Sequence, residues 1–325
     1  MVVPDAGPGP ATEIGLLPGE SLTPGSWLFL NDWSNPPDTV FALPAGDLGG
    51  ARHVVMKANR VWSMGTNVDG STIFFSSNDP DQQADFGITV GDSIQNTFSY
   101  DTASHAVALL APAGTGWINV NDECQRPVNG QWVYVCRRYD FTDTDFKGWR
   151  IGRIRIATGA FEFLRADAPT GPWELAAQDI PGTSRILYEQ RTRPPGTTYS
   201  LWTLDLVSHV DQMVLVNAGR PTLAPDGHRV AFHSTTDRFK LWMFDLATPA
   251  APATNISPTD GAGDVAWSPD GQTIVYTVYD QPNNCDHLER VTWTGTAWSA
   301  PIRVRDCTIT HEFITDIAWV TVANF

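Results

Sequence analysis

The sequence lacks the linear motifs that mark the common enzyme classes. It contains no Gly-x-Ser-x-Gly nucleophile elbow, no phosphate-binding glycine-rich loop, no His-Glu-x-x-His pair and no dinucleotide-binding fingerprint. These absences argue against the common hydrolases, kinases and dehydrogenases. They leave open an active site assembled from residues far apart in the sequence, because such a site has no linear signature.

Positive charge is also scarce. The chain has 21 basic against 36 acidic side chains, a net charge of −15, and no run rich in lysine or arginine. Because phosphate binding requires a basic surface, no nucleic-acid partner is predicted. An acidic surface favours solubility, and it also favours cationic partners or calcium.

Long apolar runs are missing as well. No stretch approaches the roughly 20 apolar residues that cross a bilayer, so the sequence predicts no transmembrane segment. Helical periodicity of useful length is absent too. Residues 1–20 are rich in proline and glycine and are expected to be a disordered leader, followed by a single domain over residues 21–325.

Cysteine is limited to four residues, Cys124, Cys136, Cys285 and Cys307. Four cysteines allow three disulfide connectivities, and spacing alone does not choose among them. The Cys-x-x-Cys spacing of zinc sites is absent, so no zinc–thiolate site is predicted.

A pair of near-copies is the clearest positive signal. The segment Arg220-Pro-Thr-Leu-Ala-Pro-Asp-Gly is followed 44 residues later by Asp264-Val-Ala-Trp-Ser-Pro-Asp-Gly, and an apolar strand-like run follows each copy. Proline presets φ for a turn, aspartate can hydrogen-bond its own backbone, and glycine accepts positive φ. A repeat of this period predicts a fold of stacked supersecondary units.

The same pattern of a turn followed by a strand recurs along the whole chain. A turn glycine followed by an apolar, β-branched or aromatic run recurs at Gly25, Gly70, Gly130, Gly182, Gly227 and Gly271. A second echo, Leu201-Trp-Thr-Leu-Asp-Leu against Leu241-Trp-Met-Phe-Asp-Leu, predicts a third strand, and shorter runs predict a fourth. Four antiparallel strands in about 45 residues are typical of a propeller blade, so the sequence predicts an all-β, six-bladed β-propeller.

The two ends of the chain are expected to close the ring. Asp316-Ile-Ala-Trp near the C-terminus repeats Asp264-Val-Ala-Trp, whereas Gly25 has no strand before it. We therefore expect the C-terminal strand to be the innermost strand of the blade that residues 26–56 complete. Pairing of the two ends removes an exposed sheet edge.

These motifs are similar to those of the TolB-like family of six-bladed propellers. The resemblance rests on Ala266-Trp-Ser-Pro-Asp-Gly, Ala231-Phe-His-Ser and Leu241-Trp-Met-Phe-Asp-Leu. It implies a periplasmic or cell-surface protein whose partner enters the mouth of the central channel. The chain has no room for the separate N-terminal α/β domain of TolB, so a role in the Tol-Pal system is not expected.

Two further expectations follow from the propeller assignment. Cys124 pairs with Cys136 and Cys285 with Cys307, each within one blade, which predicts an oxidising compartment. The leader resembles the linker after the lipidated cysteine of bacterial surface lipoproteins, which implies a lipid anchor upstream of residue 1.

Strand direction predicts where a site would lie. The Pro-Asp-Gly turns share one face, so the starts of first strands and the ends of second strands share the opposite, channel-mouth face. The polar residues that end the second strands are Asn31, Ser76, Cys136, Glu189, His233 and Thr277. At the channel mouth we place Asn59, Arg220, Asp264 and Asp316.

One guanidinium and two carboxylates from consecutive blades could bind a charged or hydroxylated ligand, or a cation. The alternative is structural: Arg220 pairs with the aspartates, and His233 bonds to backbone. A general-base role for His233 needs a nearby carboxylate, and Glu189 is the candidate.

The sequence therefore predicts a monomeric, non-catalytic cell-envelope protein that binds a protein or peptide at the channel-mouth face, without a cofactor. The alternative is a carbohydrate-active enzyme, either a polysaccharide lyase or a glycosidase that uses Asp264 and Asp316. A lectin is a third possibility, with exposed tryptophans such as Trp33, Trp149 or Trp298 as its signature.

Overall fold

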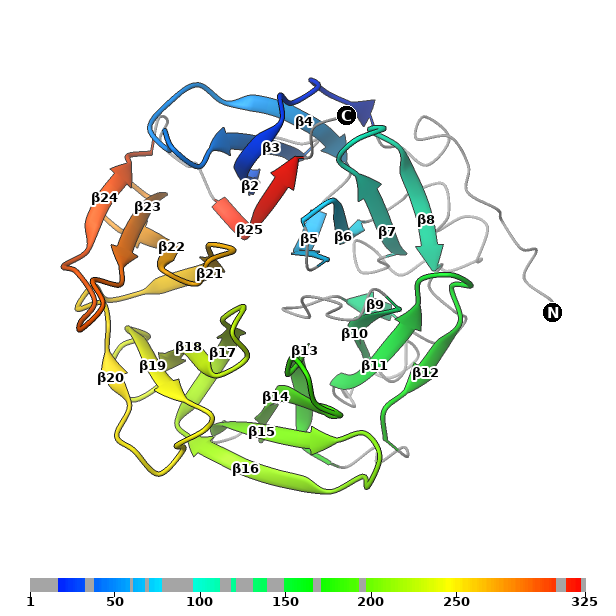
Figure 1. Cartoon of the computed structure of the whole chain (residues 1–325), viewed down its shortest axis with the longest axis vertical. Coiled ribbons are helices and arrows are strands. Elements are labelled where there is room, and N and C mark those ends of the chain that lie inside the picture. Colours follow the sequence, from blue (N-terminus) through cyan, green and yellow to red (C-terminus); the bar gives the residue numbers. More distant parts are fainter. Residues whose placement is uncertain are drawn as a thin grey trace.

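The strands predicted from the repeat are arranged radially in six sheets around a central axis, as the computed structural model shows (Figure 1). The structure describes residues 17–32, 38–58, 61–67, 70–77, 96–111, 118–120, 131–138, 149–165, 171–192, 197–307 and 314–322. All regular elements in these ranges are strands. They include no helix long and apolar enough to cross a membrane.

Each sheet is one blade of four antiparallel strands, numbered here from the N-terminus, and blade 1 carries one additional short strand. Blade 1 contains β1 (Leu17–Pro18), β2 (Gly25–Asp32), β3 (Asp38–Pro44), β4 (His53–Ala58) and β25 (Ile314–Val322). Blade 2 contains β5 (Val61–Thr66), β6 (Thr72–Ser77), β7 (Asn96–Asp101) and β8 (Val107–Ala111). Blade 3 contains β9 (Ile118–Val120), β10 (Trp132–Arg138), β11 (Trp149–Arg155) and β12 (Phe161–Phe163).

The second half of the ring follows the same order. Blade 4 contains β13 (Trp173–Asp179), β14 (Arg185–Arg191), β15 (Tyr199–Asp205) and β16 (Asp211–Val216). Blade 5 contains β17 (Ala218–Leu223), β18 (Arg229–Ser234), β19 (Leu241–Asp245) and β20 (Thr254–Asn255). Blade 6 contains β21 (Ala262–Trp267), β22 (Thr273–Asp280), β23 (Cys285–Thr292) and β24 (Ile302–Arg305). The predicted six-bladed propeller is confirmed.

The ring closes as expected from the two ends of the chain. The C-terminal strand β25 pairs antiparallel with β2, with Gly25 opposite Val322 and Leu30 opposite Ile317. It is the innermost strand of blade 1 (Figure 1).

The N-terminal boundary differs from the one predicted at residue 20. Leu17 and Pro18 pair with Lys57 and Met56 of β4, and the N–H of Gly19 donates to the carbonyl of Val55 at 2.8 Å. The reason is that the outer edge of β4 offers backbone groups to any extended segment beside it. The segment 17–20 therefore lies with blade 1, while residues 1–16 fall outside the described ranges.

The core consists of six apolar clusters, one between each pair of neighbouring blades. In β2, Phe29 packs toward blade 2, whereas Leu28 and Leu30 pack toward blade 6. Because a second strand is covered on both faces, its side chains are apolar without alternation. This explains why the sequence shows uninterrupted apolar runs after each turn glycine.

The Pro-Asp-Gly turns have the geometry that their residues favour. Asp226 accepts hydrogen bonds from the N–H groups of His228 and Arg229, at 2.8 and 3.1 Å. Gly227 and Gly271 have φ of +75° and +65°, a region that residues with a Cβ rarely adopt. Each turn thereby fixes the start of a second strand.

One predicted disulfide is described completely. Cys285, at the start of β23, is bonded to Cys307, which follows β24. Cys136 is also disulfide-bonded, but its predicted partner Cys124 lies outside the described residues.

Candidate functional site

The first strands of five blades are irregular near the channel-mouth face. Each has a register shift against its neighbouring strand, located at Trp62/Met64, Leu175/Gln178, Gly219/Thr222, Ala262/Val265 and, in β25, opposite Leu30/Asn31. Such β-bulges re-aim side chains and are over-represented next to functional sites.

The bulged residues carry unusual backbone angles. Ala176, Arg220 and Asp316 have φ of +53°, +49° and +52°. A non-glycine residue in this region costs on the order of 1 kcal/mol and persists only where its surroundings impose it. The bulges thus place Arg220, Asp264 and Asp316 at equivalent positions of blades 5, 6 and 1.

The strand register assigns a different residue to this position in blade 2. Thr66 lies opposite Ile73, as Trp267 lies opposite Ile274 in blade 6. The blade 2 residue equivalent to Asp264 is therefore Ser63, and not Asn59. Asn59 itself falls outside the described residues. The prediction of Asn59 assumed that Trp62 corresponds to Trp267, because Asp264 lies three residues before Trp267 and Asn59 three residues before Trp62. The structural counterpart of Trp267 in blade 2 is Thr66.

Asp264 joins the three blades at the channel mouth. Its Oδ2 atom accepts a hydrogen bond from the backbone N–H of Asp316 at 2.9 Å. Its Oδ1 atom lies 3.9 Å from Nη1 of Arg220. The Arg220 side chain is 47% exposed and that of Asp264 is 21% exposed. The predicted neighbours therefore meet, and both remain accessible from solvent.

Asp286 is a further acidic residue that the sequence did not single out. It lies at the start of β23, next to Cys285, and accepts a hydrogen bond from the N–H of Ile314 at 2.9 Å. Burial raises the pKa of Asp286 to about 6, and the negative charge of Asp264 acts in the same direction. The sequence predicts site residues only at the starts of first strands and the ends of second strands, whereas Asp286 is the second residue of a third strand.

The residues that end the second strands are buried, as expected from their register. All six, Asn31, Ser76, Cys136, Glu189, His233 and Thr277, are at most 3% exposed. Two of them contact a bulge of the next blade: Glu189 accepts the N–H of Arg220, and His233 is hydrogen-bonded to the backbone of Gly263.

Glu189 serves the bulge of the next blade. One carboxylate oxygen accepts the backbone N–H of Arg220 at 2.5 Å, and the other accepts the Nε–H of Arg191. By accepting the backbone N–H of Arg220, the Glu189 carboxylate stabilises the left-handed backbone conformation of Arg220. These contacts favour a structural role for Glu189 over pairing with His233.

His233 is neutral at physiological pH. Burial and the positive charge of Arg220 together lower its pKa to about 3, although a hydrogen bond to the Gly263 backbone opposes the shift. Its Nε2 atom has no hydrogen-bond partner among the described residues. His233, Arg220, Asp264 and Gly263 border a cavity of about 20 Å³, enough for about one water molecule.

A second, larger hollow lies at the other end of the channel. Its volume is about 190 Å³, and its lining includes Trp267, Trp319, Pro181, Pro225 and Pro269. These prolines belong to the repeated turns, so the turn face is not a closed surface.

The candidate metal and sugar contacts receive little support. Within the described ranges, no group of three or more His, Cys, Asp or Glu side chains could hold a metal ion. Trp298 is half-buried, and its ring centroid lies 5.7 Å from that of Trp267. Trp149 is also half-buried, against the cluster between blades 3 and 4. Trp33 lies outside the described residues.

Comparison with known proteins yields structural similarity alone. No protein-family model matches the chain, and no curated protein matches its sequence. TolB from Acinetobacter baumannii is similar over 91% of this chain and 66% of its own length, with a TM-score of 0.67 and 14% identity. A TolB-like protein from Agrobacterium tumefaciens is similar over 93% of this chain and 100% of its own, with a TM-score of 0.56 and 13% identity.

An oligogalacturonate lyase in complex with manganese is also similar, over 88% of this chain and 78% of its own length. The TM-score is 0.54 and the identity is 11%. This chain therefore has a six-bladed propeller fold, and its structure is similar to those of TolB-like proteins and of at least one lyase.

Proposed function

We propose that this chain is a non-catalytic, extracytoplasmic propeller that binds a protein or peptide at the channel-mouth face. The observation that carries the proposal is the contact of Arg220, Asp264 and Asp316 across three blades. A bidentate guanidinium suits a carboxylate of the partner, and the neighbouring aspartates suit a basic side chain. A partner with alternating charge would satisfy both.

Two features support the compartment. The Cys285–Cys307 disulfide favours an oxidising environment, since cytosolic thiols are kept reduced. The acidic surface, with a net charge of −15, favours a partner with basic segments. A monomeric state and a lipid anchor upstream of residue 1 remain predictions.

Charge reversal at the channel mouth tests the proposal. A photo-crosslinking amino acid at a channel-mouth position is used to capture the partner from envelope extract, and its affinity for the purified protein is then measured. We expect Arg220→Glu to weaken binding by at least about tenfold, since truncating a buried charged contact costs about 2 kcal/mol or more. Arg303→Glu is the matched control, because its side chain is 46% exposed on an outer strand.

A partner whose affinity is the same for both variants would overturn the assignment of the face. A partner captured equally well by a crosslinker on the turn face would do the same.

A carbohydrate-active enzyme is the second candidate, and Asp286 favours it. Two carboxyl groups with different pKa values are the usual acid and base of such enzymes, and Asp286 has a raised pKa beside Asp264. Depolymerisation of pectic polysaccharide by the purified protein, lost in both Asp264→Asn and Asp286→Asn, would establish this function. Absence of product with intact, folded protein would reject it.

A further inference from the structure

The hairpin formed by β15 and β16 exposes an unusual amount of apolar surface. Val207, Val210, Met213 and Val216 are 79%, 62%, 50% and 54% exposed. The other large apolar side chains exposed in the described residues, Phe239, Tyr279 and Ile302, lie singly on other elements. Met213 and Val216 lie on the same face of β16, because they pair with Trp202 and Ser200, and exposed apolar surface of this kind marks interaction sites.

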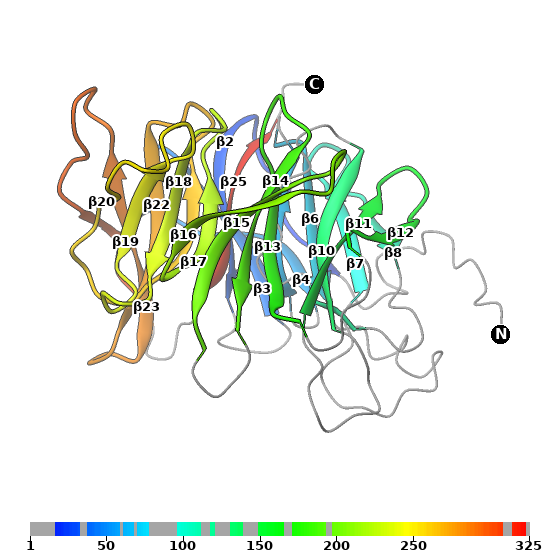
Figure 2. The same cartoon turned by 90° about the horizontal axis from the view of Figure 1, so that it is seen from below.

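Strand β16 also differs from the other outermost strands. It has six residues and is the last strand of its sheet, on the outer rim of the ring (Figures 1 and 2). The other outermost strands are shorter, although β8 by one residue only: β8, β12, β20 and β24 have five, three, two and four residues. In blade 1 the outer edge of β4 is covered by β1.

Proteins protect free edges with short strands, lysine, proline or a covering segment. Residues 205–216 contain no lysine, arginine or proline. Among the described residues, the outer edge of blade 4 therefore has no covering strand and no lysine, arginine or proline, and its protection is limited to the register shift opposite Leu201/Trp202 and the charge of Asp211.

The register shows which backbone groups face outward. Asp205 donates its N–H to the carbonyl of Val210, and Gln212 lies opposite Thr203 in the ladder. Hydrogen-bonded and non-hydrogen-bonded pairs alternate in antiparallel sheets, so Asp211 and Met213 direct their N–H and C=O groups away from β15. These groups can accept an added strand.

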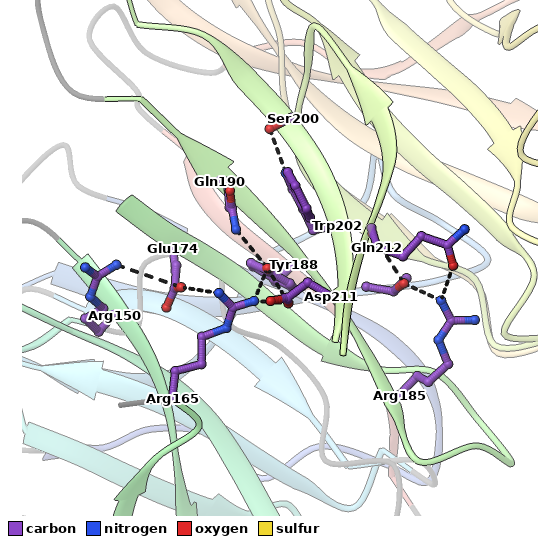
Figure 3. Close-up of polar contacts among 11 residues, drawn as sticks. Arg150, Arg165, Glu174, Arg185, Tyr188, Gln190, Ser200, Trp202, Asp211 and Gln212 are labelled. Carbon is purple, nitrogen blue, oxygen red and sulfur yellow. Dashed lines mark hydrogen bonds and ion pairs between the residues drawn. The ribbon is translucent and has the colours of Figure 1, made fainter. Parts of the chain in front are cut away.

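The start of β16 is held rigidly by a polar network (Figure 3). Asp211 accepts hydrogen bonds from the Tyr188 hydroxyl at 2.9 Å and from Arg165, and Arg165 also lies 3.2 Å from the buried carboxylate of Glu174. Arg150 flanks the same carboxylate at 3.8 Å. The network ties β16 to blade 3, so an added strand would meet an ordered edge.

A hollow adjoins this edge. Its volume is about 530 Å³, and it is lined by Phe163, Leu164, Arg165, Leu204, His209 and Asp211. It lies between the end of blade 3 and the β15–β16 hairpin, and its apolar lining can receive a large side chain. The edge and the hollow are continuous through Asp211.

We propose that β16 is a docking edge for an extended peptide segment that adds to blade 4 as an outer strand. The segment carries apolar residues at alternate positions, to cover Met213 and Val216, and basic residues at its flanks. Basic flanks complement the net charge of −15. This surface is separate from the channel mouth.

A second copy of the chain fits less well. A stable dimer buries about 800 Å² on each partner, and one six-residue edge on the convex outer wall offers less. Two molecules of charge −15 also repel each other.

A designed peptide tests the proposal directly. The probe is a fluorescent peptide of about ten residues that alternates valine and threonine between flanking lysines, and anisotropy measures its affinity. We expect a Kd below about 100 μM, weakened at least about tenfold by Val216→Lys and by Met213→Pro. Ile302→Lys is the matched control, because Ile302 is 53% exposed on another outer strand.

Hydrogen exchange locates the peptide independently, with added protection expected at residues 211–216. No binding at about 1 mM, equal effects of Val216→Lys and Ile302→Lys, or equal binding of a glutamate-flanked peptide would overturn the proposal. A doubling of molar mass that Val216→Lys abolishes would assign the edge to a second copy instead. Arg220→Glu should leave peptide binding unchanged, which separates this proposal from the channel-mouth function.

Discussion

Single residues at the channel mouth show both the reach and the limit of sequence reasoning. The register of the second strands was predictable, because each turn glycine fixes the count to the residue that ends the strand. Glu189 and His233 are accordingly buried at equivalent positions. Asp286 was not predictable, since its proximity to Asp264 depends on how a third strand begins.

The ionisation of Asp286 gives a pH-dependent prediction. Its folded pKa of about 6 lies above the usual aspartate value of 3.8, so the folded state binds the proton more tightly than the unfolded state. Stability should therefore increase as pH falls from about 6 to 4, and Asp286→Asn should remove this dependence. We expect the variant to be more stable than the wild type at pH 7 by about 1–2 kcal/mol after allowance for solvent screening.

Urea unfolding of both proteins between pH 4 and pH 8 measures the difference. Parallel stability curves for the two proteins would contradict the raised pKa.

At the scale of elements, the sequence repeat predicted the blades, but it did not predict the bulges in their first strands. Four strands per unit are encoded by turn glycines and apolar runs, which are local signals. A bulge depends on contacts with the next blade, such as the bond from the Arg220 N–H to Glu189. This is also why the sequence assigned Asn59, and not Ser63, to the position in blade 2 that Asp264 occupies in blade 6.

The bulge in β21 requires a residue without a side chain. A Cβ atom at Gly263 would lie 2.2 Å from Oγ1 of Thr277, which is far inside van der Waals contact. We expect Gly263→Ala to destabilise the fold by about 1–3 kcal/mol and to weaken partner binding at Asp264. The control is Gly46→Ala, because no atom lies within 4 Å of a Cβ at that position.

Thermal unfolding compares the two glycine variants. A Gly263→Ala protein as stable as Gly46→Ala would show that the bulge can rearrange at little cost.

On the scale of the whole molecule, the predicted closure is correct and the predicted N-terminal boundary needs a finer test. Deletion of residues 1–16 should leave the melting temperature unchanged, whereas deletion of residues 1–20 should lower it by a few degrees. The reason is that the second deletion removes the pairing of Leu17 and Pro18 with β4. A 100-residue domain loses roughly 4–8 °C per kcal/mol and a larger one less, so calorimetry can resolve the difference.

Equal melting temperatures for both deletions would support the predicted boundary between leader and domain at residue 20. A loss of stability already in the shorter deletion would mean that the leader contributes to folding.

The closure of the ring also has a consequence for synthesis. Trp319 donates a hydrogen bond to Ser26, a residue 293 positions earlier, and β25 completes a blade begun at Gly25. During translation the inner edge of β2 therefore stays unpaired until β25 has been synthesised. Contacts of such long sequence separation slow folding and prolong the exposure of strand edges. The nascent chain should depend on chaperones until its final strand is made.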